Sequence, residues 1–144
     1  MVHVERTFLV RKETDKVVEY LKDFANAEVW GPGTVSCKRV DSGPIHSGSQ
    51  WHNVSEFKGK QTELAYELKY LAENRLTFVG ENKTATSTDD LNFTTVPEGT
   101  SITYHADIVF HGIAKLADPF LKHEFERLGD EVVTTMTRVL EALK

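Results

Sequence analysis

Three tyrosines are predicted to lie on one face of a β-sheet. Tyr66 and Tyr70 alternate with charged residues in the segment 61–71, and Tyr104 alternates with polar residues in the segment 100–110. Each ring alone fits ordinary core packing, but a buried tyrosine hydroxyl needs a hydrogen-bond partner, and three of them suit a dry core poorly. An apolar cavity with a few polar anchors accommodates them better. The pattern therefore indicates binding of a small molecule.

A neighbouring segment carries further side chains for the same cavity. Trp51, Asn53, Ser55 and Phe57 occupy every second position. Successive side chains of a strand point to opposite faces, so these four are predicted to share the inward face. The two rings would provide apolar contact, while the amide and the hydroxyl would orient a ligand.

Three charged residues are also placed where they can turn inward. Arg6, Arg39 and Asp89 each share a phase with apolar neighbours on their segments. Two interpretations remain open for each of them: a satisfied polar pair at the rim of the barrel, or an anchor for the polar end of a ligand. A charge left unpaired in an apolar pocket would be costly, so either role requires a partner.

Histidine and metal chemistry are not predicted. Four of the six histidines fall on the polar side of a predicted strand: His3, His52, His105 and His111. A histidine general base in the cavity is therefore unsupported, and no two histidines have the spacing of a metal site on one element. Cys37 is interpreted as a small buried hydrophobe, and no phosphate loop or dinucleotide fingerprint is present. We predict neither a metal nor a cofactor.

Alternating apolar and polar residues from about residue 33 to residue 110 predict an antiparallel sheet with one covered face. A first strand is expected at Val2–Val10. The six that follow are Thr34–Asp41, Ser49–Lys58, Gln61–Leu71, Leu76–Glu81, Ala85–Thr95 and Thr100–Phe110. Turn residues separate them, most clearly Pro97-Glu98-Gly99. The sheet should thus contain about seven strands.

Helical patterns flank this sheet on both sides. Val17, Leu21 and Phe24 have helical spacing, with Thr14 or Asp15 as the expected N-cap. A second and longer helix is expected to start at Asp118-Pro119, with Asp as N-cap and Pro in the first turn. Its apolar stripe consists of Leu121, Phe125, Leu128, Val132, Met136, Val139 and Leu143. At about 37 Å, this helix is long enough to cover the sheet from end to end.

Composition and charge restrict the partners. The chain has 144 residues, a formal net charge of −5 and one cysteine. Nucleic acid is not an expected partner, because phosphate binding needs a concentrated basic face. The single cysteine excludes an intrachain disulfide, and no apolar run is long enough for a signal peptide or a transmembrane segment. The cytoplasm is the expected compartment.

The order of strand, short helices, six strands and long helix, together with several short motifs, resembles the START-related superfamily. This superfamily includes polyketide cyclases, lipid-transfer domains and birch-pollen-allergen-like proteins. The motifs are the segment Val17–Trp30 with the break Trp30-Gly31-Pro32-Gly33, the turns at Gly48, Gly59 and Gly99-Thr100, and the ending His111-Gly112, Asp118-Pro119 and Arg127-Leu128-Gly129. The resemblance covers the whole chain and implies one domain, 1–144, of α+β helix-grip fold. It also implies a pocket between sheet and helix, but no single activity.

The predicted function is the binding of a small hydrophobic molecule, such as a lipid, a polyketide-like aromatic or an isoprenoid. The predicted ligand-binding residues are Trp51, Asn53, Ser55, Phe57, Tyr66, Leu68, Tyr70, Phe93, Tyr104, Ile108, Phe125, Leu128, Val132 and Met136. One alternative is a cyclase or dehydratase, in which a tyrosine acts with Arg6, Arg39 or Asp89. An Arg or Asp that reaches a tyrosine hydroxyl inside the cavity would favour this enzyme. A third hypothesis is a protein-interaction module that uses the outer face of the sheet.

Overall fold

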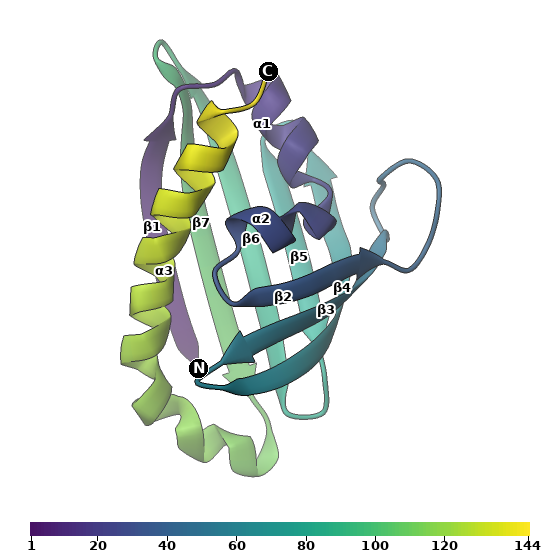
Figure 1. Ribbon diagram of the computed structural model, residues 1–144, viewed down its shortest axis with the longest axis vertical. Coiled ribbons are helices and arrows are strands. Elements are labelled where there is room, and N and C mark those ends of the chain that lie inside the picture. The colour runs from purple at the N-terminus through teal and green to yellow at the C-terminus, as the bar shows by residue number, and fades with distance from the viewer.

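A curved antiparallel sheet forms the frame of the molecule (Figure 1). The computed structural model describes the backbone of residues 1–144 and all side chains except those of residues 117–120. Over this backbone, the strands are β1 (Val2–Val10), β2 (Thr34–Arg39), β3 (Gln50–Phe57), β4 (Lys60–Ala72), β5 (Arg75–Glu81), β6 (Ala85–Val96) and β7 (Gly99–Phe110). They follow the order β1-β7-β6-β5-β4-β3-β2, and all neighbours are antiparallel. The predicted sheet of about seven strands is confirmed.

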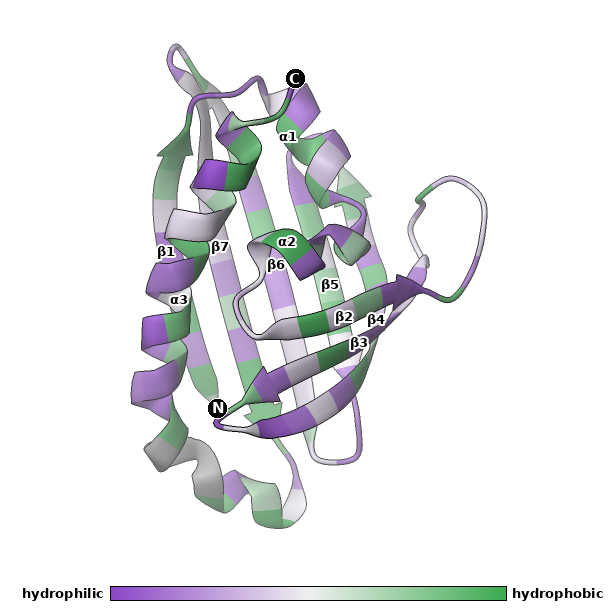
Figure 2. Cartoon of the chain, viewed as in Figure 1, coloured by the Kyte–Doolittle hydropathy of each residue, from purple (hydrophilic) through white to green (hydrophobic). Residues whose placement is uncertain are grey.

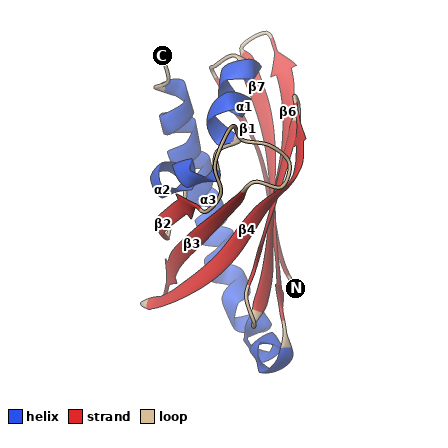
Figure 3. Cartoon of the chain, turned by 90° about the vertical axis from the view of Figure 1, so that its right-hand side faces the viewer, coloured by secondary structure: helices blue, strands red, loops and turns tan.

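Helices occupy the concave side of this sheet. They are α1 (Thr14–Leu21), η1 (Phe24–Asn26), α2 (Ala27–Trp30), η2 (Gly112–Ala117) and α3 (Asp118–Glu141). Because β1 and β2 lie at opposite edges, the connection that contains α1, η1 and α2 has to cross the sheet. The long helix α3 packs beside β1, and Figure 3 shows the sheet bent around the helices. This arrangement is the predicted α+β helix-grip fold.

The alternation in the sequence becomes the two faces of the sheet. Figure 2 shows hydrophobic and hydrophilic residues alternating along the strands. On β7, Ile102 and Tyr104 are buried on the concave side, whereas Val132 and Met136 are buried on the side of α3 that faces them. The buried face of the strands, which repeats every two residues, thus packs against the buried face of α3, which repeats with the helical period.

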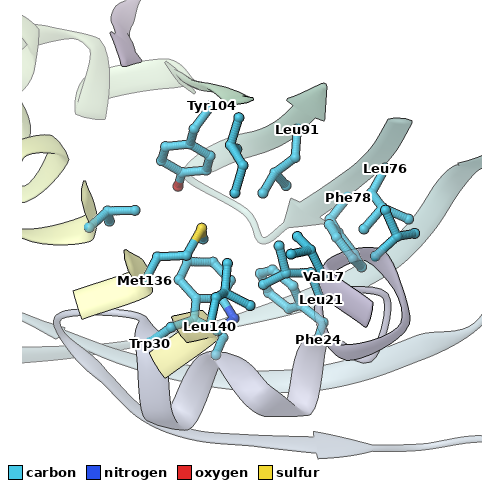
Figure 4. Close-up of a cluster of buried hydrophobic side chains, with 14 of the residues drawn as sticks. Val17, Leu21, Phe24, Trp30, Leu76, Phe78, Leu91, Tyr104, Met136 and Leu140 are labelled. Atoms are coloured by element: carbon cyan, nitrogen blue, oxygen red, sulfur yellow. The ribbon is translucent and has the colours of Figure 1, made fainter. Parts of the chain in front are cut away.

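One end of the interior is a packed apolar core (Figure 4). The connection across the sheet contributes Val17, Leu21 and Phe24, all buried. They meet buried side chains of the sheet and of α3, which are Leu76, Phe78, Leu91, Met136 and Leu140. The rings of Phe24 and Phe78 lie 4.5 Å apart between their centroids. Since α1 and η1 fill this end, the inner cavity lies towards α2 and the first half of α3.

The predicted inward orientation of Tyr70 is wrong. The pairing of β4 with β5 shifts register between Leu68 and Tyr70, so that Leu68 lies opposite Phe78 and Tyr70 opposite Thr77. Such a bulge adds one residue and exchanges the two faces beyond it. Tyr70 is 49% exposed on the outer face, and its ring lies under the Arg75 guanidinium at 5.2 Å.

The start of α1 is described in full, whereas the first side chains of α3 are not described. Helix α1 begins at Thr14 and has Glu13 as N-cap, without a side-chain cap. The predicted caps Thr14 and Asp15 are therefore wrong, and the Thr14 hydroxyl instead contacts the hydroxyls of Thr95 and Thr100. Helix α3 begins at Asp118, and the predicted N-cap role of the Asp118 side chain lies outside the described side chains. Among the described residues, no helix has the length and hydropathy needed to span a membrane.

Candidate functional site

An internal cavity lies between the sheet, α2 and α3. Its volume is about 140 Å³, and its walls come from β1, β3, β4, β6, β7, α2 and α3. It continues into an outer groove of about 520 Å³. Inner cavity and groove share Pro32, Ser55, Tyr66, Ser87, Ile108, Phe125 and Leu128 on their walls. A molecule can therefore extend from the groove into the protein interior.

A polar cluster, formed by Asp89, Tyr104, Tyr66 and Ser87, lies on the wall of the inner cavity. Asp89 on β6 and Tyr104 on β7 are both buried, and the Tyr104 hydroxyl donates to Asp89 Oδ1 at 2.5 Å. The Tyr66 hydroxyl on β4 donates to Ser87 Oγ at 3.2 Å. An aspartate therefore reaches a tyrosine hydroxyl inside the cavity.

Burial controls the protonation of this cluster. It raises the pKa of the Asp89 carboxyl from its ordinary 3.8 to about 6, although hydrogen bonds from Tyr104 and Tyr66 oppose the shift. The pKa values of Tyr66 and Tyr104 are raised well above 10, first by burial and then by the charge of Asp89. Near neutral pH the two phenols remain hydrogen-bond donors, while Asp89 can gain or lose a proton. That combination suits general acid–base chemistry.

A glycine on β5 positions the Tyr66 ring. Gly80 lies opposite Tyr66 on β4 and opposite Ser87 on β6. A Cβ atom at Gly80 would lie 2.6 Å from the Cε2 and Cζ atoms of Tyr66, so the ring rests directly on the glycine backbone. The ring also packs against Phe24, at 4.5 Å between centroids. This packing directs the hydroxyl towards Ser87.

Asn53 and Ser55 add a second polar pair to the cavity wall. The Ser55 hydroxyl donates to Asn53 Oδ1 at 2.7 Å, and Asn53 is buried. Both lie on β3, where they share the inward face with the buried ring of Trp51 as predicted. The Trp51 indole donates to Asp23 Oδ1 at 3.0 Å, which fixes this ring at the core side of the wall.

Of the three charged candidates, only Asp89 lines the inner cavity. Arg6 pairs with Glu126 at 3.0 Å and with Asp130 at 2.9 Å, both on α3. The helix lies close to β1 beside this pairing, because a Cβ atom at Gly129 would be 2.6 Å from Val4 Cγ1 and 3.5 Å from Arg6 Cζ. Arg6 is therefore a satisfied residue at the edge of the sheet.

Arg39 serves the loop that follows β2. Its guanidinium pairs with Asp41 at 2.7 Å and donates to the carbonyl oxygen of Gly43, also at 2.7 Å. It further donates to Ser49 Oγ at 3.3 Å. Arg39 therefore holds the loop in place and does not enter the cavity.

The structure brings most of the predicted ligand-binding residues to the cavity. Eight line the inner part: Asn53, Ser55, Tyr66, Tyr104, Ile108, Phe125, Leu128 and Val132. Phe57 lines the outer groove, where its ring stacks on Phe125 with centroids 4.9 Å apart. Four others are buried in the packed core instead of the cavity wall: Trp51, Leu68, Phe93 and Met136. Tyr70, on the outer face, contacts neither region.

Sequence reasoning missed two aromatic residues of the cavity wall, Phe24 and Trp30. Trp30 ends α2 and lies edge-on to Tyr104, at 6.4 Å between ring centroids. Its indole Nε1 is buried without a hydrogen-bond partner among the described residues. The break after Trp30 was the available signal, since a chain that turns there has to place this large ring under the sheet.

A curved antiparallel sheet that encloses a cavity beneath a long C-terminal helix defines the helix-grip class. The sequence matches the family described as polyketide cyclase / dehydrase and lipid transport over residues 1–144, and the chain belongs to this family. The predicted START-related assignment is confirmed. No curated protein sequence matches the chain significantly.

Solved structures share the fold at low sequence identity. A START superfamily protein from Mycobacterium smegmatis has a TM-score of 0.81 at 16% identity, with 99% of each chain covered. The Zhui aromatase/cyclase from Streptomyces sp. R1128 has a TM-score of 0.81 at 15% identity, with 96% of this chain and 93% of that chain covered. The di-domain ARO/CYC StfQ from the steffimycin biosynthetic pathway has a TM-score of 0.73 at 13% identity, with 97% of this chain and 50% of that chain covered.

Proposed function

We propose that this chain binds a small, uncharged and largely apolar molecule that carries a hydroxyl or carbonyl group. The observation that carries the proposal is the cavity under α3, in which apolar walls surround the polar cluster of Asp89, Tyr104, Tyr66 and Ser87. Concave apolar pockets with a few placed polar groups are the usual form of small-molecule sites. The family description, which includes lipid transport, also supports a hydrophobic ligand.

Charge restricts the ligand further. Among the side chains that the structure describes, Asp89 is the only charged one on the wall of the inner cavity. Glu56, Lys58 and Lys60 line the outer groove, so charges of both signs are placed for a group that stays near the opening. Inside the cavity a carboxylate ligand would face ionised Asp89 at low dielectric, where repulsion between like charges is strong. A neutral group that donates a hydrogen bond to Asp89 is favoured.

A matched pair of compact probes tests this proposal. 2-Naphthol and 2-naphthoate share the same ring system and differ in the charge of their polar group. At pH 7.5 we expect 2-naphthol to bind with roughly micromolar affinity, and 2-naphthoate at least about tenfold more weakly. In Asp89→Asn the difference between the two probes should shrink, because the repelling charge is gone. Isothermal titration calorimetry measures all four affinities.

Two further variants distinguish binding of 2-naphthol in the cavity from binding at the outer surface. Val132→Phe places a ring in the inner cavity and should weaken 2-naphthol binding, because ring and probe compete for the same volume. Tyr70→Ala removes a ring from the outer face and should leave the affinity unchanged. Equal affinity for both naphthalene probes, or no binding of 2-naphthol, would contradict the proposal.

A second candidate function is proton-transfer catalysis of the dehydratase or cyclase type. The observation that favours it is the 2.5 Å hydrogen bond between Tyr104 and Asp89 inside the cavity. In this proposal the Asp89 carboxylate removes a proton next to a ligand carbonyl, and a tyrosine hydroxyl donates to the carbonyl oxygen. When a β-hydroxy ketone reacts, the protonated Asp89 carboxyl then returns this proton to the leaving hydroxyl as the C–O bond breaks, a carbon–carbon double bond forms, and water leaves. The aromatase/cyclase among the structural neighbours supports this candidate.

The test uses 4-hydroxy-4-phenylbutan-2-one, whose dehydration product is a conjugated enone with a strong ultraviolet absorbance. We expect the wild-type protein to accelerate the loss of water, and Asp89→Asn to reduce that rate by at least about a hundredfold. Asp90→Asn is the matched control, because Asp90 binds Arg75 and Thr77 and lies outside the lining of the inner cavity. A wild-type rate equal to that in buffer would remove this candidate and leave the binding proposal intact.

A further inference from the structure

Four side chains that can bind metals lie together on the outer face of β1 and β7. The antiparallel register places His3 opposite Asp107 and Glu5 opposite His105. The four form a compact square, because directly opposed residues of a strand pair have Cβ atoms about 5 Å apart. We call these four residues the outer histidine cluster. Their strand neighbours Val4 and Tyr104 point the other way, into the cavity.

The contacts within the outer histidine cluster are short. His3 Nδ1 contacts Asp107 Oδ1, and His105 Nδ1 lies 3.2 Å from Glu5 Oε1. The two imidazole rings are 5.7 Å apart between centroids. One ligand atom each from His3, Glu5 and His105 can be chosen so that all three lie within 4.8 Å of one another. The three side chains can therefore bring their ligand atoms close to one another.

The remaining adjustment to a metal site is small. Zinc–nitrogen distances of 2.0–2.1 Å in a tetrahedral site imply ligand atoms about 3.3 Å apart. His3 and Glu5 have about half of their side-chain surface exposed, at 50% and 53%. Rotation about their side-chain torsions can therefore draw the ligand atoms together without moving the backbone.

Asp107 has a separate role in this arrangement. When His3 donates its Nδ1 hydrogen to Asp107, its Nε2 lone pair is free to bind a metal. Carboxylates that orient ligating histidines in this way accompany metal sites regularly and raise the basicity of the ring. Two imidazoles with a carboxylate suit zinc and its transition-metal neighbours, whereas magnesium and calcium prefer oxygen ligands.

We propose that the outer histidine cluster binds a divalent transition-metal ion of the zinc type. His3, Glu5 and His105 are the ligands, and Asp107 orients His3. The site is independent of the cavity, because its side chains lie on the opposite face of the same two strands. A bound ion would join the edge strand β1 to β7, which carries Tyr104, and would stabilise this strand pair.

The test is isothermal titration calorimetry of the full chain, freed of metal by chelation, with zinc chloride at pH 7.5. We expect one ion to bind with a dissociation constant of about 10 µM or lower. His3→Gln and His105→Gln should each weaken binding at least about tenfold, or about 1.4 kcal/mol. His52→Gln is the matched control: His52 also pairs with a carboxylate across two strands, Glu63 at 2.7 Å, but does so as a single histidine.

Spectroscopy and a second metal test the identity of the ligands and the preference for a transition metal. Cobalt(II) should give visible absorption bands in the wild-type protein and lose them in His105→Gln, while magnesium chloride should give no binding heat. Circular dichroism confirms that the exposed substitutions leave the fold intact. No zinc binding at about 100 µM would overturn the proposal. So would unchanged affinity in His105→Gln, or an equal loss of affinity in His52→Gln.

Discussion

Asp89→Asn is expected to stabilise the folded protein by about 3 kcal/mol at pH 8 and to have little effect near pH 3. The Asp89 carboxyl is buried, and no basic side chain among the described residues forms an ion pair with it. Burial therefore raises its pKa in the folded state from 3.8 to about 6. An asparagine of the same shape can still accept the Tyr104 hydrogen bond but carries no charge.

Asp89→Asn is stabilising at high pH because the folded and unfolded states bind different numbers of protons at Asp89. Between about pH 4 and pH 6 the folded protein holds a proton on Asp89 that the unfolded chain has lost, so the contribution of Asp89 to the stability falls as the pH rises through this range. Above pH 6 the full penalty is present, and below pH 4 both states are protonated and the penalty vanishes. Urea unfolding of both proteins from pH 3 to pH 8 measures the difference.

The adjacent Asp90 provides a control with the opposite sign. Burial opposes ionisation there too, but hydrogen bonds from Arg75 and Thr77 outweigh it and lower the pKa of Asp90. Asp90→Asn should therefore destabilise the protein at neutral pH, and this loss should disappear as the pH falls through the pKa of Asp90. Parallel pH profiles of the wild-type protein and Asp89→Asn would show that Asp89 carries no buried charge.

This stability profile bears on function. A group that destabilises the fold at neutral pH is typical of a site residue, since such sites often sacrifice stability for activity. The prediction therefore distinguishes Asp89 from the satisfied charges of Arg6 and Arg39, which hold structure at the rim.

Gly80→Ala is expected to destabilise the protein by about 1–2 kcal/mol and to weaken binding of 2-naphthol. The new Cβ atom would lie 2.6 Å from the Tyr66 ring, which also packs against Phe24. Overpacking of this kind costs about 1–3 kcal/mol, while removal of a glycine from a strand returns roughly 0.5–1 kcal/mol. The ring has to move, so its hydroxyl should leave Ser87 and the cavity wall should change shape.

A double-mutant cycle with Tyr66→Leu tests this cause. Without the ring, Gly80→Ala should lose most of its destabilising effect, so the two substitutions should be strongly non-additive. Tyr66→Phe, which keeps the ring and removes only the hydroxyl, should not relieve the strain. If the changes in the free energy of unfolding were additive, the contact between Gly80 and Tyr66 would not be the cause of the destabilisation.

Local periodicity predicted much of this protein. Alternation in the strands and helical spacing in the C-terminal segment determined the order of elements, the helix-grip fold and the inward orientation of residues such as Asn53, Tyr66 and Tyr104. These patterns can be read from one sequence because the direction of a side chain along a regular strand or helix depends only on the nearby backbone.

Where that backbone is irregular, the same reasoning failed. Tyr70 has the inward phase of Tyr66 in the sequence, but the bulge after Leu68 reverses the two faces. A bulge depends on how β4 pairs with β5, and the sequence of β4 alone contains no clear sign of it.

The boundary between core and cavity was also decided by tertiary structure. Leu68 and Phe93 share the inward phase of the residues on the cavity wall, yet they are buried in the packed core. Phase identifies the covered face of a strand, but it does not say what covers each part of it. Here Val17, Leu21 and Phe24, which come from the connection across the sheet, fill one end of the interior (Figure 4), and the cavity lies beside this core.

The partnerships that define the two proposed sites likewise arise between strands. Asp89 lies near Tyr104 because β6 and β7 pair in one register, and His3 lies near His105 because β7, late in the chain, pairs with the edge strand β1. These pairs are separated by 15 and 102 positions along the chain, and their spacing there has no period that would reveal them. The sequence by itself determined which face each side chain occupies. Only strand pairing over long sequence distances decided which of these side chains meet.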